Sequence, residues 1–316
     1  MSSNHAIDTN PPNGTDIHIT RRGSSWLWAV FSIMAVSDLI IIGWHFMVPR
    51  GQRVFHQLAA IILTTASIAY FAMASDLGFA AITTEFSGHG FPAGTYRQIW
   101  YIDWVITTPA LLLELVLASA LPLSDIITLI FFDLVMIITG LIGALVPSRY
   151  KFGFFAFGCA ALFYIWWALL GPARTSARTI GAPFKRSLTI SAAYLSFIWL
   201  LYPIAWGVSD GGNVISPDSE MVFYGILDLL AKPVFCFLHL WQLSRLALTL
   251  LQLRSGKFSA YASDTTTLHN EKVGHHGAGT TGVTAGPGRH SDATVVDNDS
   301  NHGYIIPMRI WPMTMV

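Results

Sequence analysis

An acid and a base interrupt the apolar stretch GILDLLAKPVF at residues 225–235. Asp228 and Lys232 are four residues apart, so a helix would present both side chains on one face. Placing an ionisable group at membrane depth is costly, and such groups usually have a function. A buried structural ion pair is one interpretation. The other is that the Lys232 amine, the only lysine inside an apolar span, carries a covalent ligand as a Schiff base.

Two further acids, Asp103 and Glu114, share the segment YIDWVITTPALLLELVL. Eleven helical residues make about three turns plus 20° and rise about 16 Å, so both carboxyl groups lie on one face. If this face meets the face that carries Lys232, acids lie on both sides of the amine and form an ordered proton path. Interhelical hydrogen bonding alone is a weaker explanation for so many acids around one lysine. The remaining acids within apolar runs are Asp38 and Asp133.

The composition is that of a polytopic membrane protein. The 316 residues are 53% hydrophobic and only 11% charged. A net charge of zero gives no basic surface for nucleic acid. Both cysteines, Cys159 and Cys236, lie in apolar runs and are predicted to be small core residues rather than a disulfide or metal site.

Seven apolar runs are long enough to cross a bilayer, which takes about 20 residues each. The connections between them are short and rich in turn residues, so neighbouring helices are expected to be antiparallel. The fold class is therefore all-α, a seven-transmembrane-helix bundle over residues 25–254, with a segment 1–24 before it and a disordered tail 255–316 after it. The predicted spans are 25–48, 54–75, 96–119, 123–146, 150–170, 188–208 and 219–250.

Lysines and arginines in the short loops predict the orientation, because they gather on the cytoplasmic side. One side of the bundle receives Arg50, Arg53, Arg174, Arg178, Lys185, Arg186, Arg245, Arg254 and Lys257, against Arg21, Arg22, Arg97, Arg149 and Lys151 on the other. We therefore expect the N-terminus outside and the C-terminal tail in the cytoplasm, in an integral protein of the plasma membrane. The sequon at Asn13 would then lie outside, where it is a candidate for glycosylation.

An aromatic stripe runs along the sixth predicted span. Trp199, Tyr202, Pro203 and Trp206 recur at i, i+3, i+4 and i+7. Such a stripe is typical of core packing, and beside a reactive lysine it is also suited to wall a flat apolar ligand.

Four ordered motifs resemble the microbial rhodopsin family, over about residues 25–250. They are DWVITTP with Glu114, DLVMIITGLIGAL at 133–145, WLLYPIAW at 199–206 and DLLAK at 228–232. The loop before the seventh span looks most like the fungal, bacteriorhodopsin-like branch. The resemblance implies a bilayer setting and is compatible with a homo-oligomer.

The same resemblance implies a cofactor and a set of site residues. All-trans retinal would be bound to Lys232 as a protonated Schiff base, with Asp103 as proton acceptor and counterion and Asp228 as second counterion. Glu114 falls at the proton-donor position and Glu220 at a proton-release position; Asp210 falls one residue from the second release position. The positions that match the retinal pocket are Trp104, Thr108, Met136, Gly140, Trp199, Tyr202, Pro203 and Trp206, and Tyr70 matches a tyrosine that hydrogen-bonds the second counterion.

One departure from the family concerns an arginine three residues before the acceptor aspartate. Here that position is Trp100, and the nearest arginine is Arg97, six residues before Asp103. If the span is helical there, Arg97 points about 120° away from the Asp103 face. Either Arg97 reaches inward or the arginine is absent.

The leading functional hypothesis is a light-driven outward proton pump that moves protons without being an enzyme. A slow-cycling sensory or regulatory rhodopsin is the second hypothesis, and the missing arginine favours it. A retinal-free membrane chaperone is the third, but it leaves Lys232 without a role. A G-protein-coupled receptor shares the helix count, yet the third span has no Asp-Arg-Tyr and the seventh no Asn-Pro-x-x-Tyr.

Overall fold

A computed structural model describes residues 4–85, 94, 96–99 and 103–251, which all belong to one compact unit within residues 1–261. Seven helical spans confirm the predicted fold class; six are long enough to cross a membrane, and α4 is shorter. The spans are α2 (Arg21–Met47), α3 (Val54–Ala74), α4 (Trp104–Val116), α5 (Leu123–Leu145), α6 (Lys151–Ala168) with η2 (Leu169–Ala173) and α7 (Arg174–Ile180), α8 (Ala182–Trp206) with η3 (Gly207–Gly211), and α9 (Pro217–Leu229) with η4 (Leu230–Val234) and α10 (Phe235–Leu243). Short elements lie outside the spans: α1 (Ala6–Thr9), η1 (Arg50–Gln52) and η5 (Leu248–Leu251).

The third span begins later than its sequence predicts. Residues Tyr96–Ile99 form strand β2, which pairs antiparallel with β1 (Ala80–Thr83), and Ile17 adds a parallel bridge to Arg97. Helix α4 starts only at Trp104, with Asp103 as its N-terminal cap residue. The predicted start at residue 96 was wrong because Arg97 and Gln98 are buried against polar partners instead of lipid.

The predicted loop at 171–185 is mostly helical. The fifth span continues past Ala168 through the π-helical turn η2, which contains Pro172, and extends as α7 to Ile180. A π turn accommodates a proline because the bond that the missing N–H would make is already displaced. The helix ends at Gly181, and α8 begins at Ala182 instead of the predicted residue 188. The last span also ends earlier than predicted, at Leu243.

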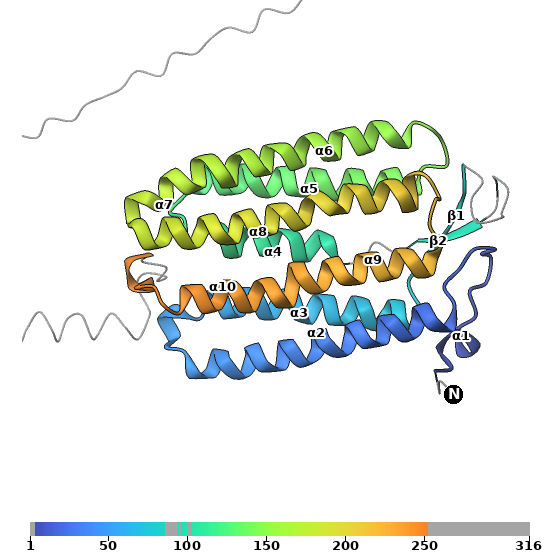
Figure 1. Cartoon of the computed structure of the whole chain (residues 1–316), viewed down its shortest axis with the longest axis horizontal. Helices are drawn as coiled ribbons and strands as arrows, with labels where there is room; N and C mark the ends of the chain where they lie inside the picture. The colour runs from blue at the N-terminus through green and yellow to red at the C-terminus, as the bar shows by residue number, and fades with distance from the viewer. Residues whose placement is uncertain (1–3, 86–93, 95, 100–102, 252–316) are drawn as a thin grey trace, which may run out of the picture. The chain divides into compact units, whose positions relative to one another are not determined.

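The two ends of the bundle differ in structure. Figure 1 shows α1, β1 and β2 at one end and α7 at the other, and we name them the hairpin end and the α7 end. At the hairpin end the Gln98 side chain accepts a hydrogen bond from the Ile19 amide, at 3.1 Å, and donates one to Asp76. Burial raises the pKa of the Asp76 carboxyl, and the bond from Gln98 opposes that shift.

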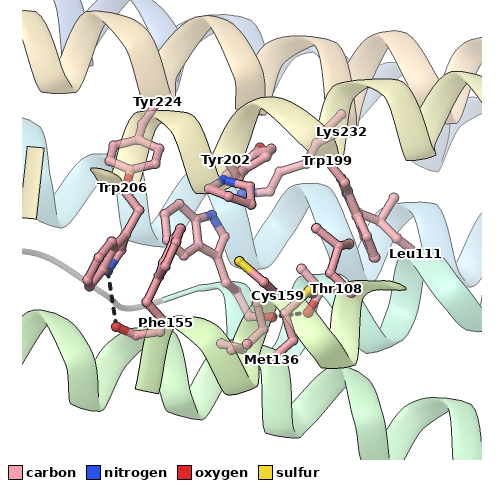
Figure 2. Close-up of a pocket in the computed structure, with 17 residues that line it drawn as sticks. Thr108, Leu111, Met136, Phe155, Cys159, Trp199, Tyr202, Trp206, Tyr224 and Lys232 are labelled. Carbon is pink, nitrogen blue, oxygen red and sulfur yellow. Dashed lines mark hydrogen bonds between the residues drawn. The ribbon is translucent and has the colours of Figure 1, made fainter. Parts of the chain in front are cut away.

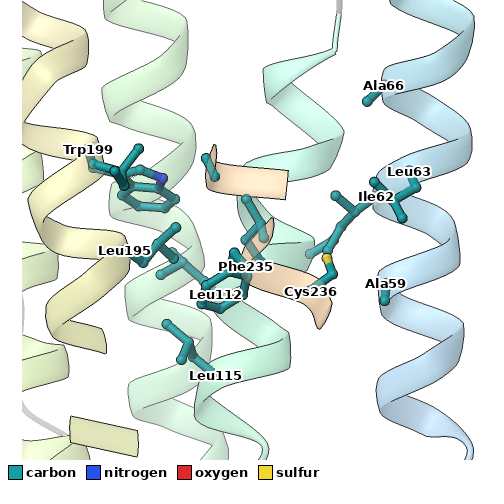
Figure 3. Close-up of a cluster of buried hydrophobic side chains, with 14 of the residues drawn as sticks. Ala59, Ile62, Leu63, Ala66, Leu112, Leu115, Leu195, Trp199, Phe235 and Cys236 are labelled. Carbon is teal, nitrogen blue, oxygen red and sulfur yellow. The ribbon is translucent and has the colours of Figure 1, made fainter. Parts of the chain in front are cut away.

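The bundle interior is apolar and continuous. Figure 3 shows part of it, with Ile62 and Leu63 from α3, Leu112 and Leu115 from α4, and Leu195 from α8 around one buried region. A polar or charged group in this interior is therefore cut off from water and depends on protein partners. Trp100 and the predicted tail 255–316 lie outside the described residues.

Candidate functional site

Lys232 lies where the seventh span changes its winding. Helix α9 gives way to the π turn η4, which contains Lys232 and Pro233, and the chain resumes as α10. The side chain is buried, with 1% of its surface exposed. Its Nζ donates hydrogen bonds to Asp103 and, at 2.9 Å, to Asp228 Oδ2. The structure thus brings together the lysine and the two acids that the sequence singled out.

The two carboxylates beside Lys232 have unequal surroundings. Asp228 also accepts hydrogen bonds from the hydroxyl groups of Tyr70, at 2.8 Å, and Tyr202, and from Trp104 Nε1 at 3.3 Å. Within the described residues, the Asp103 carboxylate has Lys232 as its hydrogen-bond partner. Asp228 therefore accepts hydrogen bonds from three other spans, whereas Lys232 is the one partner of the Asp103 carboxylate among the described residues.

A cavity extends from Lys232 between α4, α5, α6 and α8, with about 760 Å³ of empty space including its open part. Figure 2 shows the lysine entering it beside Tyr202 and Trp199. All eight residues that the sequence assigned to the pocket line this cavity: Trp104, Thr108, Met136, Gly140, Trp199, Tyr202, Pro203 and Trp206. Tyr70 is not among the lining residues and acts on Asp228 instead.

Sequence reasoning missed one whole wall of the cavity. Phe155, Gly158, Cys159 and Leu162 line it from α6, and Leu111, Ile137, Tyr224 and Ala231 complete the lining. The four α6 residues recur at i, i+3, i+4 and i+7, the same spacing that drew attention to the sixth span. That spacing could have identified this wall from the sequence, but two of the four residues have small side chains and form no aromatic stripe.

Aromatic contacts fix the shape of the cavity. Trp206 stacks on Phe155, with ring centroids 4.7 Å apart and planes 16° apart, and its Nε1 donates to the Gly140 carbonyl at 3.3 Å. Trp104 packs edge-on against Tyr202 at 5.5 Å. Thr108 donates to Asp133 at 2.9 Å, which gives that buried acid a partner between α4 and α5. These contacts surround a mostly apolar cavity that has the Lys232 amine in its lining.

Toward the hairpin end lies a second buried cluster of charges. Arg97 donates to Glu220 and, at 3.0 Å, to the Ile215 carbonyl. Both carboxylate oxygens of Asp210 are buried without a hydrogen-bond partner among the described residues. Lys151 Nζ donates to the Asp210 carbonyl at 2.9 Å. Arg97 is buried, but it belongs to strand β2 and pairs with Glu220, so the helical geometry expected for it was wrong.

Toward the α7 end the buried acids Glu114 and Asp38 have uncharged partners in the described part of the chain. Glu114 is fully buried; Cys236 Sγ lies 3.8 Å from its Oε2, and its Oε1 has no hydrogen-bond partner in the described part of the chain. Asp103 and Glu114 therefore both contact the seventh span, as a shared helix face requires. Asp38 contacts Thr64 at 2.7 Å instead of these residues.

Comparison with known proteins identifies the family to which the chain belongs. The family described as Bacteriorhodopsin-like protein matches residues 22–246. The chain belongs to this family. Among its relatives is Protein FDD123 of Trametes versicolor, 53% identical over 270 residues that cover 83% of this chain and 93% of the relative. The opsin-like protein carO of Fusarium fujikuroi is 51% identical over 75% of this chain and 80% of its own length.

Solved structures agree with this membership in the bacteriorhodopsin-like family. A light-driven proton pump from Leptosphaeria maculans is 33% identical, with a TM-score of 0.68. The match covers 73% of this chain and 100% of that protein. This bacteriorhodopsin-like chain is accordingly an integral membrane protein with a seven-helix bundle.

Proposed function

We propose that this protein is a light-driven outward proton pump with all-trans retinal bound covalently to Lys232. The observation that carries the proposal is a buried lysine that contacts two carboxylates and lines an apolar cavity. The Leptosphaeria maculans relative, whose structure is described as that of a light-driven proton pump, supports it.

The residues present fit the cofactor. Retinal is a long, flat, apolar aldehyde, and a lysine amine condenses with an aldehyde to a Schiff base with loss of water. Trp104, Trp199, Tyr202 and Trp206 offer flat walls, and Lys232 offers the amine at one end. When bound, retinal supplies light absorption and the light-driven change of shape that starts proton transfer.

Asp103 is assigned as the proton acceptor. Its carboxylate contacts the Lys232 nitrogen directly. Asp228 touches the same nitrogen, but its lone pairs are already engaged by Tyr70, Tyr202 and Trp104. A carboxylate saturated with donors gains less from a further proton, so Asp228 serves as the fixed counterion.

The exit path runs toward the hairpin end. Glu220, paired with Arg97, and the neighbouring buried Asp210 are assigned as the release group. Two acids and two cations, Arg97 and Lys151, at close quarters allow one proton to be shared and then lost. Glu114, buried on the α7 side of Lys232 and in contact with the span that carries it, is assigned as the donor that restores the proton on the Lys232 nitrogen.

Outward pumping requires the hairpin end outside. The described residues at the α7 end include Arg50, Arg53, Arg174, Arg178, Lys185, Arg186 and Arg245. Short cytoplasmic loops typically carry an excess of lysine and arginine. This supports a cytoplasmic α7 end, a cytoplasmic tail over residues 255–316 and an external segment over residues 1–24. We further propose that the membrane is the plasma membrane, where outward pumping would acidify the medium.

The test is light-induced acidification by cells that express the chain with retinal. Illumination is expected to acidify the medium, a protonophore to abolish the signal, and Asp103→Asn to abolish it while the protein keeps a visible colour. Light-induced alkalinisation, or a coloured protein that moves no protons, would overturn the proposal.

A slow-cycling sensory protein is the second candidate. It is favoured by Arg97, which pairs with Glu220 in the hairpin-end cluster instead of lying on the helix that carries Asp103. A coloured protein with no acidification and a photocycle lasting seconds or longer would select this candidate.

A further inference from the structure

The last turn of α4 is held by two side chains from a single face of α10. Cys236 and His239 are three residues apart, so they lie on the same side of that helix. Both reach the same residue of α4: Cys236 Sγ lies 3.8 Å from Glu114 Oε2, and His239 Nε2 lies 3.2 Å from the Glu114 carbonyl oxygen. All three residues are fully buried.

The carbonyl of Glu114 needs an outside partner because α4 ends there. Helix α4 stops at Val116, and the amide of Ala118, which would bond Glu114 in a continuing helix, bonds Leu115 at 3.3 Å. His239 supplies the donor that the helix itself no longer provides. A buried carbonyl without that donor would carry a large desolvation penalty.

The contacts of His239 define its tautomer. A carbonyl oxygen only accepts, so Nε2 of His239 carries the hydrogen. In the neutral ring Nδ1 is then an acceptor, and the Ser191 hydroxyl, 2.8 Å away, donates to it. Gln242 Nε2 donates in turn to Ser191 Oγ at 3.2 Å. Phe235 stacks on the imidazole at 5.5 Å with planes 8° apart, so the ring is fixed in position as well.

The carboxyl group of Glu114 has a separate contact, with Cys236. The Cys236 thiol donates to Oε2, and Oε1 has no partner among the residues that the structure describes. A thiol is a weak donor, so this contact orients the carboxyl group without competing strongly for its proton. Figure 3 shows Cys236 in an apolar setting with Ile62 and Leu63 nearby on α3.

We propose that Cys236 and His239 are positioning residues that clamp Glu114, the thiol at its carboxyl group and the imidazole at its backbone carbonyl. The proposal rests on the proposed function for the role of Glu114 as donor. Both clamp residues belong to the span that carries Lys232, four and seven residues after it. A rearrangement of the span at Lys232 is therefore transmitted to Glu114, and the clamp times the transfer of its proton to the lysine nitrogen.

Infrared absorption of the S–H bond tests the clamp in the dark, so the result does not depend on pumping. The full-length sequence has two cysteines, and a Cys159→Ala background leaves Cys236 as the sole S–H signal. In that background the S–H band is expected at low frequency, as a bonded thiol requires. Glu114→Leu should move it upward, and Glu114→Gln, which keeps an oxygen acceptor, should move it less. A band that does not move in Glu114→Leu overturns the thiol contact.

His239→Phe tests the second contact, because phenylalanine keeps the stacking on Phe235 and removes the N–H. The S–H band is expected to shift in His239→Phe as the freed end of α4 relaxes, and to stay in place in a matched Gln242→Ala variant, which leaves the Ser191–His239 bond intact. An unmoved band in His239→Phe overturns the two-point clamp.

Flash photolysis tests whether the clamp sets the rate at which the Lys232 nitrogen is reprotonated. Cys236→Ala and Cys236→Ser are expected to change the rate of Lys232 reprotonation several-fold with little change in colour. Identical rates in both variants overturn the timing role. A parent protein that does not acidify the medium overturns the proposed function instead, and the infrared result on the clamp stands by itself.

Discussion

The two halves of the bundle on either side of Lys232 differ in the partners of their buried acids. Toward the hairpin end, Asp103 and Asp228 are buried and accept hydrogen bonds from Lys232, and beyond them Arg97 and Glu220 form a second buried ion pair. Toward the α7 end, the corresponding acid is Glu114, which has one weak thiol contact and an oxygen without a described partner. One half contains buried ion pairs, whereas the described acids of the other half, Glu114 and Asp38, have only uncharged hydrogen-bond partners.

This difference makes the surroundings of Lys232 asymmetric along the bundle. Charged groups at the hairpin end stabilise one another and offer several places for a proton. In the apolar half an ionised carboxyl has little to compensate it, so Glu114 gives up its proton only when a charge nearby changes. Under the proposed function, a proton that leaves the Lys232 nitrogen would go toward the hairpin end, and Glu114 would supply its replacement.

The largest expected effect comes from the residue on which both halves converge. Lys232→Ala removes the amine at the end of the cavity and is expected to abolish visible absorbance completely when retinal is supplied. Absorption spectra of purified protein measure this, with Lys185→Ala as a matched control that keeps its colour. A coloured Lys232→Ala protein would place the ligand attachment elsewhere.

Glu114→Gln tests the apolar half. A positioned acid contributes roughly 100-fold or more to a proton transfer, so reprotonation of the Lys232 nitrogen should slow by about that factor. Colour should change little because Glu114 does not line the cavity. Photocycle decay after a flash, at several pH values, provides the measurement; decay at the parental rate would remove Glu114 from the pathway and erase the contrast between the halves.

Most of this contrast was predictable from sequence, because it depends on helical spacing. Asp228 and Lys232 lie four residues apart, and Asp103 and Glu114 eleven, so their faces follow from the helix repeat alone. The aromatic stripe on α8 indicated the cavity for the same reason. The wall from α6 has the same spacing, but Gly158 and Cys159 are small and did not stand out.

What the sequence did not predict depends on contacts between distant segments. Arg97 lies in a strand because residues 80–83 pair with it, and no local pattern records that partner. The partner of Glu114, Cys236, is 122 residues away and looked like an ordinary core residue. The partner of the Glu114 carbonyl at the end of α4 is likewise distant, because His239 belongs to another span.

Arg97→Gln tests how tightly the charged half is bound together. It leaves Glu220 buried without its cation, and breaking a buried pair in this way typically costs about 3–5 kcal/mol. Thermal loss of colour should therefore occur at a clearly lower temperature. The double variant Arg97→Gln/Glu220→Gln is expected to recover part of the loss, because no uncompensated charge remains. Arg21→Gln, which breaks only the exposed pair with Asp8, is the control and should barely change the transition. Equal transitions for Arg97→Gln and the control would mean that the buried pair does not stabilise the hairpin end.

The smallest expected effect concerns the edge of the charged half, at Asp76. Burial raises the pKa of this carboxyl in the folded protein above its ordinary value of 3.8. The folded state then binds the proton more tightly than the unfolded state, so stability falls as pH rises from about 4 through the folded pKa and is constant above it. Asp76→Asn should remove this slope, since asparagine keeps an oxygen for Gln98 and tolerates the backbone φ of 58° found here. The expected change in transition temperature at neutral pH is an increase of about 2 °C or less. Thermal bleaching of both proteins between pH 4 and pH 8 measures the slope. A parent whose stability instead rises across this range, with the same rise in Asp76→Asn, would show that groups other than Asp76 set the pH dependence of stability.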